Sequence, residues 1–281
     1  MGLKELVLLR IAKRWICGVD LKSAIASAKK DNSRGLGVVV NFLGEEIKDP
    51  ATADSHTEEY LRLQQALADN SIRGFPSVKL TQLGLVLDVP SASSRLEKIA
   101  ANSEKLNQWL WVDMEGSKFT DSTISVYEGA LEKHKRVGVA IQSYLKRTEN
   151  DLKTLLNMGA KVRLVKGAYH ESHDIVLPSR REIRKNYISQ MQMLFDQGEF
   201  FALGTHDSVL VNAAKKMSDS KHVDFEFEFL KGIREDLKEE LVKSGYKVSD
   251  YLPYGDQWYN YSKRRITEHP SNVWLLLRSL V

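Results

Sequence analysis

Short apolar segments alternate with helical patterns along most of this chain. The first apolar segment, Leu36–Glu45, is hydrophobic on both faces, which is typical of a strand buried in a parallel sheet. The next segment, Asp54–Ala68, opens with cap residues and carries leucine and alanine at helical spacing. Together the two segments predict one strand–helix unit.

The same pair of patterns recurs to the end of the chain. Further strands are predicted over residues 77–84, 109–115, 136–143, 161–168, 200–206, 223–230 and 247–254. Helices are predicted over residues 91–106, 122–131, 149–157, 180–197, 209–217, 234–244 and 258–268. Eight such units without a low-complexity linker favour an α/β fold of the distorted (βα)8 barrel type over an open doubly wound sheet.

The barrel pattern leaves the start of the chain unassigned. We predict an N-terminal helical arm over residues 1–35 and a catalytic barrel domain over residues 36–281. Basic and apolar residues interleave in Leu6–Ile16, which predicts a helix packed on the barrel or on a neighbouring subunit. Contact with an anionic membrane surface is the alternative interpretation of the same segment.

Composition narrows the class of protein. The 281 residues include 41 basic and 37 acidic side chains, so the formal charge of +4 gives no reason to expect nucleic-acid binding. The single cysteine, Cys17, excludes an internal disulfide and a four-thiolate metal site, which fits a reducing compartment. No apolar run approaches the ~20 residues of a membrane span, and the N-terminus lacks a signal-peptide pattern. We therefore expect a soluble cytoplasmic protein.

Candidate chemistry lies where the predicted strands end, because barrels of this type build their active sites there. The polar residues at those ends are Glu45, Lys79, Gln82, Asp113, Glu115, Gln142, Arg163, Lys166, Thr205, His206, Asp207, Glu226, Glu228, Tyr251 and Tyr254. Burial of so many charged groups indicates a polyanionic or zwitterionic ligand.

The fifth strand is the most informative. Arg163 shares one strand face with Val165, and Lys166 falls on the other face or on the following turn. Gly167-Ala168 lets backbone approach a ligand closely. The segment favours a phosphate-bearing cofactor, and an exposed turn with Arg163 in a structural salt bridge is the alternative.

Two other segments carry candidate chemistry. Arg264 and Arg265 can reach one carboxylate only if the last helix crosses the barrel mouth, and a solvated helix face is the alternative. His170 and His173 have the spacing of metal ligands, but no third ligand is evident, so no metal is predicted. A Gly-x-Gly-x-x-Gly strand turn, a Walker loop and a Gly-x-Ser-x-Gly elbow are all absent from the sequence.

Several ordered motifs resemble those of proline dehydrogenases. The resemblance runs from Leu43–Glu45 to the last predicted helix and so covers nearly all of the barrel. Its motifs are Leu43-Gly-Glu45, Ser77-Val-Lys-Leu-Thr-Gln82, Val112-Asp-Met-Glu115, Val162-Arg-Leu-Val-Lys-Gly-Ala-Tyr169, Leu203-Gly-Thr-His206, Glu228-Phe-Leu-Lys-Gly-Ile233, Tyr251-Leu-Pro-Tyr-Gly255 and Arg264-Arg265.

The resemblance implies a distorted barrel that binds FAD non-covalently and oxidises L-proline. Hydride would pass from proline C5 to flavin N5, giving Δ1-pyrroline-5-carboxylate in the first step of proline catabolism. Quinone is the expected electron acceptor, with peripheral contact at the inner face of the cell membrane. A separate pyrroline-5-carboxylate dehydrogenase would take the product.

The resemblance also implies roles for single residues. Arg264, Arg265 and Lys79 would hold the substrate carboxylate, Glu45 would pair with a basic neighbour, and Tyr251 and Tyr261 would pack on the proline ring. Asp113 would orient these groups, and Arg163 would lie beside flavin N5. The remaining flavin contacts would be Met114, Gln142, Lys166, Gly167, Ala168, Tyr169, Thr205, His206 and Glu228. One departure is His170, where many relatives have a tryptophan near the cofactor.

Two other classes of protein stay open on the residues alone. A Schiff-base lyase or aldolase on the same fold would use Lys79 or Lys166 as its nucleophile. A non-catalytic subunit would use the N-terminal arm to dock.

Overall fold

A closed parallel barrel forms the centre of the molecule. The structure is a computed structural model that describes Leu9, residues 12–259, Tyr261 and Ser262. Within these residues eight strands pair in sequence order, and the last pairs with the first. The predicted (βα)8 barrel is therefore confirmed. The strands are β1 (Gly37–Phe42), β2 (Gly74–Lys79), β3 (Leu110–Asp113), β4 (Val137–Gln142), β5 (Lys161–Val165), β6 (Phe200–Gly204), β7 (Asp224–Leu230) and β8 (Lys247–Tyr254).

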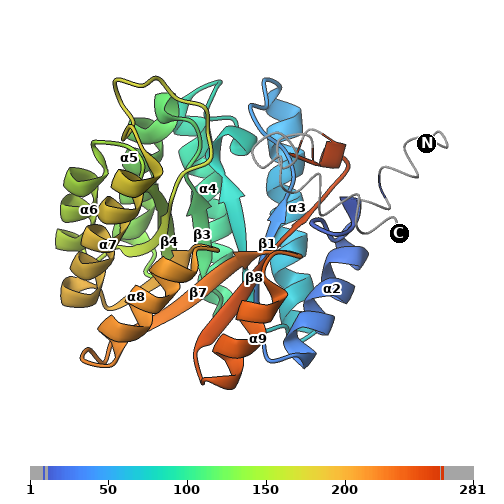
Figure 1. The fold of residues 1–281 in the computed structure, drawn as a ribbon. Coiled ribbons are helices and arrows are strands. Elements are labelled where there is room, and N and C mark those ends of the chain that lie inside the picture. The colour runs from blue at the N-terminus through green and yellow to red at the C-terminus, as the bar shows by residue number, and fades with distance from the viewer. Residues whose placement is uncertain (1–8, 10–11, 260, 263–281) are drawn as a thin grey trace.

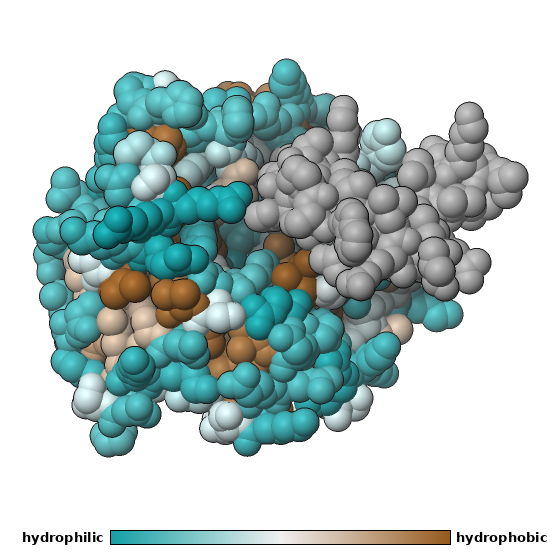
Figure 2. All heavy atoms as spheres, viewed as in Figure 1, coloured by the Kyte–Doolittle hydropathy of each residue, from teal (hydrophilic) through white to brown (hydrophobic). Residues whose placement is uncertain are grey.

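Helices surround the barrel on the outside (Figure 1). Side chains that precede several of them accept first-turn amides, as Asp49, Asp88 and Ser179 do. The helices that follow strands are α3 (Pro50–Asp69), α4 (Val89–Lys105), α5 (Thr120–Lys133), α6 (Thr148–Asn157), α7 (Arg180–Gln197), α8 (Ser208–Ser218) and α9 (Glu235–Lys243). Hydrophilic residues cover most of the side of the molecule seen in Figure 2, as expected for the outer faces of such helices.

One further helix, α2 (Leu21–Ser33), precedes the first strand. It contacts β1 and β8, and its Ala24 and Ala28 are buried in the main core. Helix α2 therefore covers the wall between the last strand and the first. The sequence analysis did not separate this helix from the rest of the N-terminal arm, and the domain boundary at residue 35 stays a prediction.

Several predicted strands are too long at the mouth of the barrel, where β1 ends at Phe42 rather than at Glu45 and β3 at Asp113 rather than at Glu115. β2 ends at Lys79 and continues as a short 3-10 helix, η1 (Leu80–Leu83), whereas the predicted strand extended to Gly84. β5 ends at Val165 rather than at Ala168. Lys166, Gly167 and Ala168 thus lie in a loop, because apolar composition alone does not show where strand pairing stops.

A small second hydrophobic cluster joins the two ends of the chain. Ala12, Trp15 and Ile16 pack with Trp258, Tyr261 and Leu43, and the Trp15 indole donates a hydrogen bond to Ser262 Oγ at 2.9 Å. Residues 6–8, 10, 11, 260 and 263–268 of the two predicted helices over 6–16 and 258–268 lie outside the described residues. In the described part of the chain, no helix is both long and apolar enough to cross a bilayer.

Candidate active site at the carboxyl ends of the strands

A buried arginine stands at the centre of the polar barrel interior. Arg163 on β5 is 2% exposed, and its Nη1 donates to Asp113 Oδ1 at 2.7 Å and to Ser77 Oγ at 3.0 Å. Its Nε lies 2.7 Å from Glu228 Oε2 in an ion pair. The guanidinium also lies 4.6 Å from the ring centre of Trp111, a cation–π distance. These contacts fix the plane and direction of the cation.

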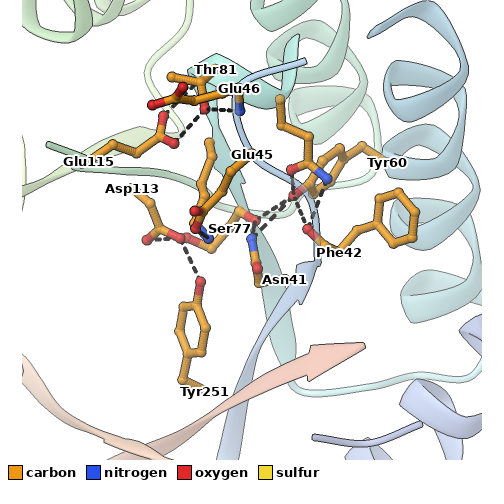
Figure 3. A network of polar contacts seen from close by, with 12 residues as sticks. Asn41, Phe42, Glu45, Glu46, Tyr60, Ser77, Thr81, Asp113, Glu115 and Tyr251 are labelled. Atoms are coloured by element: carbon orange, nitrogen blue, oxygen red, sulfur yellow. Dashed lines mark hydrogen bonds and ion pairs between the residues drawn. The ribbon is translucent and has the colours of Figure 1, made fainter. Parts of the chain in front are cut away.

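Asp113 joins three strands to this arginine. Its Oδ1 also accepts from Ser77 Oγ at 2.8 Å, and its Oδ2 accepts from the Tyr251 hydroxyl at 2.6 Å (Figure 3). Burial, and then the charge of Asp113, raise the pKa of Tyr251 well above its usual value, so this phenol stays a hydrogen-bond donor. The structure thus brings Asp113, Arg163 and Tyr251 together.

Two neighbouring carboxyls of β7 share the space on the other side of the arginine. Glu226 and Glu228 are both buried and hydrogen bond to each other. Glu226 also accepts from Ser249 Oγ at 2.8 Å. Burial, and then repulsion by Glu228, raise the pKa of Glu226 to about 8. At neutral pH one proton therefore stays between the two carboxyls, and Glu228 is the carboxylate that faces Arg163.

A second ion pair lies at the mouth. Lys79, at the end of β2, places its Nζ 2.6 Å from Glu45 Oε1 in the loop after β1. This contact agrees with the expectation that Glu45 pairs with a basic neighbour. The role of Lys79 in holding a substrate stays a prediction. Behind this pair Glu115 accepts two hydrogen bonds from Thr81.

Several buried polar atoms have no hydrogen-bond partner among the described residues, and two of them form a complementary acceptor and donor on neighbouring strands. These two are the acceptor Gln142 Oε1, at the end of β4, and the donor Arg163 Nη2, on the neighbouring β5. Native proteins rarely leave such atoms unpaired. This donor and acceptor are therefore available to a ligand that enters the barrel mouth.

The loop after β5 is held by its neighbours. Lys166 Nζ lies 2.6 Å from Asp207 Oδ2, which Arg184 also contacts at 2.9 Å. Gly167 has φ +108°, and a Cβ there would lie 2.2 Å from the Tyr144 ring. The Tyr144 hydroxyl donates to the Tyr169 carbonyl at 3.2 Å. Glycine is thus required at position 167 by the chain itself, which the sequence analysis attributed to ligand approach.

The other predicted cofactor residues line the same end of the barrel. Met114 and Thr205 are buried, whereas Ala168 is exposed. His206 Nε2 accepts a hydrogen bond from the Leu230 amide at 3.0 Å, which places the ring proton on Nδ1 in the neutral tautomer. Their roles toward a flavin stay predictions.

The remaining predicted substrate residues are Tyr261, Arg264 and Arg265. Tyr261 packs in the small cluster with Trp15 and Leu43, and it contributes to the raised pKa of Tyr251, which contacts Asp113. Arg264 and Arg265 lie outside the described residues, so their carboxylate clamp is not tested.

The sequence analysis missed Ser77, Trp111 and Ser249. Each contacts a residue that it did identify: Ser77 and Trp111 contact Arg163, and Ser249 contacts Glu226. Strand periodicity offered a signal, because Ser77 lies two residues before Lys79 and Trp111 two residues before Asp113, on the same strand faces.

Comparisons with known proteins agree on one family. A family model described as proline dehydrogenase matches residues 24–274. Proline dehydrogenase 2 of Bacillus subtilis is 34% identical over 265 residues, which cover 93% of this chain and 88% of that protein. Proline dehydrogenase of Deinococcus radiodurans is 29% identical over 279 residues, with 96% and 90% coverage.

Solved structures show a related fold. Proline utilization A from Bdellovibrio bacteriovorus, inactivated by N-propargylglycine, matches with a TM-score of 0.86 and 22% identity. The match covers 94% of this chain and 33% of that one, so the chain spans about a third of the larger protein.

Proposed function

Because the chain belongs to the proline dehydrogenase family and is an oxidoreductase acting on proline, we propose that it oxidises L-proline to Δ1-pyrroline-5-carboxylate with a bound FAD. Proline oxidation is the first step of proline catabolism, and the family is in general flavin-dependent. The choice of FAD and the roles of single residues belong to the proposal.

The unpaired atoms of Arg163 and Gln142 carry the cofactor part of the proposal. A flavin ring edge carries both acceptors and an N–H donor, so a donor and an acceptor on adjacent strands match it chemically. When bound, the flavin takes up the hydride that proline loses. Lys166, Gly167, Ala168, Tyr169, Thr205 and His206 would hold its more distant parts, and Met114 would contact the ring.

Arg163 supplies positive charge at this position. A fixed cation stabilises negative charge that develops nearby, and it does so without reorganisation when its direction is already set. Asp113 and Glu228 set that direction from opposite sides. We infer that these two carboxylates are positioning residues and that Arg163 acts directly.

Lys79, Arg264 and Arg265 would bind the substrate carboxylate. Cations that hold a carboxylate at two or more points fix the orientation of the attached ring, here proline, and so bring its C5 toward the cofactor. Tyr251 and Tyr261 would pack against that ring. Hydride leaves C5 readily only when the ring nitrogen has lost its proton and can share its lone pair.

We also propose quinone as the electron acceptor, with peripheral contact of a cytoplasmic protein at the inner membrane face. A separate pyrroline-5-carboxylate dehydrogenase would consume the product. The resemblance supports these three points, and no contact in the structure bears on them.

Schiff-base chemistry is less well supported. A nucleophilic lysine must be neutral, whereas Lys79 and Lys166 each lie 2.6 Å from a carboxylate oxygen. Both amines are thus engaged by a carboxylate instead of being free to attack a carbonyl carbon.

Identification of the released cofactor tests the flavin proposal. The purified protein is denatured by heat, and the supernatant is separated by chromatography beside FAD and FMN standards. We expect FAD in about equimolar amount. FMN, or protein that neither contains nor takes up a flavin, contradicts the proposal.

Kinetics test the substrate site. Loss of one charged contact to the carboxylate costs about 1.5–3 kcal/mol, so we expect Lys79→Met, Arg264→Ala and Arg265→Ala each to raise the KM for proline roughly 10- to 100-fold with flavin retained. Lys98→Met is the control, because Lys98 is exposed and pairs only with exposed Glu58. A wild-type KM in any of the three variants removes that residue from the clamp.

A further inference from the structure

The loop that carries Glu45 contains a strained residue. Glu46 has φ +48°, in the left-handed region that is strained for a residue other than glycine. Such a conformation persists only where surrounding contacts hold it. The contacts that hold this loop must therefore stabilise the conformation of Glu46.

Thr81 binds the loop through two hydrogen bonds. Its Oγ1 accepts a hydrogen bond from the Glu46 amide at 3.0 Å, and its carbonyl accepts one from the Ile47 amide at 3.0 Å. Thr81 is fully buried in η1, two residues after Lys79. One residue thus binds the two backbone amides that follow Glu45.

Glu115 fixes Thr81 in turn. Its Oε2 accepts from the Thr81 amide at 3.0 Å and its Oε1 from the Thr81 hydroxyl at 2.5 Å (Figure 3). Since the single hydroxyl proton goes to Glu115, the lone pairs of Thr81 Oγ1 face the Glu46 amide. The chain of contacts runs from β3 through η1 to the loop after β1.

Both members of the mouth ion pair sit beside this chain of contacts. Glu45 precedes the strained residue, and Lys79 lies two residues before Thr81. We propose that Glu115 and Thr81 are positioning residues that hold Glu45 against Lys79 and so set the geometry of the substrate carboxylate site. This inference rests on the proposed role of Lys79 in binding that carboxylate.

The environment of Glu115 supports a positional role. The side chain is 3% exposed, and no cation forms an ion pair with it among the described residues. Burial raises its pKa to about 7, although the charge of Lys79 lowers it. Burial of a carboxyl group is unfavourable unless its hydrogen bonds are satisfied, and Thr81 satisfies those of Glu115. The side chain therefore has a role beyond packing.

Thr81→Val tests the proposal, because valine keeps the shape and removes the hydroxyl. We expect the KM for proline to rise roughly tenfold with kcat changed less than threefold, and Thr81→Ser to restore a near wild-type KM. Hydrogen exchange at the Glu46 amide is expected to be at least tenfold faster in Thr81→Val than in the wild type. Thr57→Val is the matched control, since the buried Thr57 hydroxyl donates only to Ala53 within its own helix.

A second variant covers the case in which Thr81→Val does not fold. Glu115→Gln keeps the side-chain shape and loses one acceptor, and a KM at least threefold above wild type is expected. A wild-type KM in whichever variant folds overturns the proposal, whatever the exchange rates are. If Lys79→Met raises KM while Thr81→Val and Glu115→Gln do not, this inference alone fails, whereas a normal KM in Lys79→Met contradicts the proposed role of Lys79 in the carboxylate clamp.

Discussion

Two buried cations in this molecule have very different surroundings. Arg163 lies inside the barrel and Lys238 lies outside it, between α9 and β8, and they are 2% and 0% exposed. Neighbouring residues of β8 serve the two, because Tyr251 contacts the Arg163 network while Asp250 pairs with Lys238. The alternation of side chains along a strand thus separates an inner and an outer polar cluster.

The outer cation is fully satisfied by the chain. Lys238 Nζ lies 2.5 Å from Asp250 Oδ1 and donates to Glu235 Oε1 at 2.6 Å and to the Leu230 carbonyl at 3.3 Å. Three acceptors match the three protons of an ammonium group. The inner cation keeps Nη2 without a partner among the described residues. Burial alone therefore does not mark a functional site, whereas Arg163 combines burial with a donor at the barrel mouth and an acceptor, Gln142 Oε1, on the neighbouring strand, both unpaired within the described part of the chain.

Arg163→Lys is expected to have the largest effect. Lysine keeps the charge but loses the planar fork that contacts Asp113, Ser77 and Glu228 at once. We expect kcat/KM for proline to fall roughly 100- to 1000-fold, while the midpoint of thermal unfolding changes little. Steady-state kinetics beside circular dichroism melting measure both, and activity near wild type would remove Arg163 from the reaction.

Lys238→Met should have the opposite effect, a loss of stability with activity nearly unchanged. It leaves buried Asp250 without its cation, which costs about 3–5 kcal/mol, and kcat should stay within twofold of wild type. Urea unfolding measures the loss. Lys153→Met, which breaks the exposed pair with Glu149, is the control and should cost less than about 0.5 kcal/mol. A large fall in kcat for Lys238→Met would mean that the outer cluster also serves the reaction.

Glu226→Gln should change how stability depends on pH. Because the folded-state pKa of Glu226 is about 8, above its ordinary value, the folded protein holds an extra proton, and stability from this group falls as pH rises from about 5 to 8. Glutamine keeps the hydrogen bonds without the proton. We expect the stability of Glu226→Gln to fall by about 3–4 kcal/mol less than that of the wild type over that range. If the stability of the variant and that of the wild type changed equally with pH, Glu226 would not be the group that holds the extra proton.

Tyr251→Phe is expected to have the smallest effect of the four. It removes one hydrogen bond to Asp113, worth about 1.5 kcal/mol for a charged acceptor, and leaves the Arg163 contacts in place. We expect a fall of roughly tenfold in kcat/KM and a loss of stability of no more than about 1.5 kcal/mol. A change in stability without a change in kinetics would mean that Tyr251, like Asp250, supports the fold and not the reaction.

The strand–helix order and most of the chemistry at the mouth follow from the sequence. Parallel barrel strands are buried on both faces, so β1 and β4 stand out as apolar runs. The charged residues at the strand ends stand out against them. Arg163 forms ion pairs with Asp113 and Glu228, whereas the sequence offered a salt bridge of Arg163 only as the alternative to a role at the cofactor. The start of β2 does not stand out, because Gly74 and Pro76 are typical of turns, yet Pro76 pairs opposite Val40.

The residues of the inner cluster could be predicted from the sequence better than those of the outer cluster. Lys238 lies in Glu235–Lys243, where charged residues are typical of an exposed helix face, and only tertiary packing buries it. Ser77 looks like any strand serine until Arg163 approaches it from a strand 86 positions later. Contacts of this kind depend on side-chain geometry across the barrel, which no local pattern encodes.

The central claim is that the unfilled polar capacity around Arg163 and Gln142 holds a flavin that oxidises proline. Anaerobic addition of L-proline to the purified, flavin-loaded protein tests it most directly, with the visible absorption spectrum as the readout. We predict a yellow protein whose flavin absorbance bleaches with L-proline and stays unchanged with D-proline. A flavin spectrum unaffected by L-proline would contradict the account.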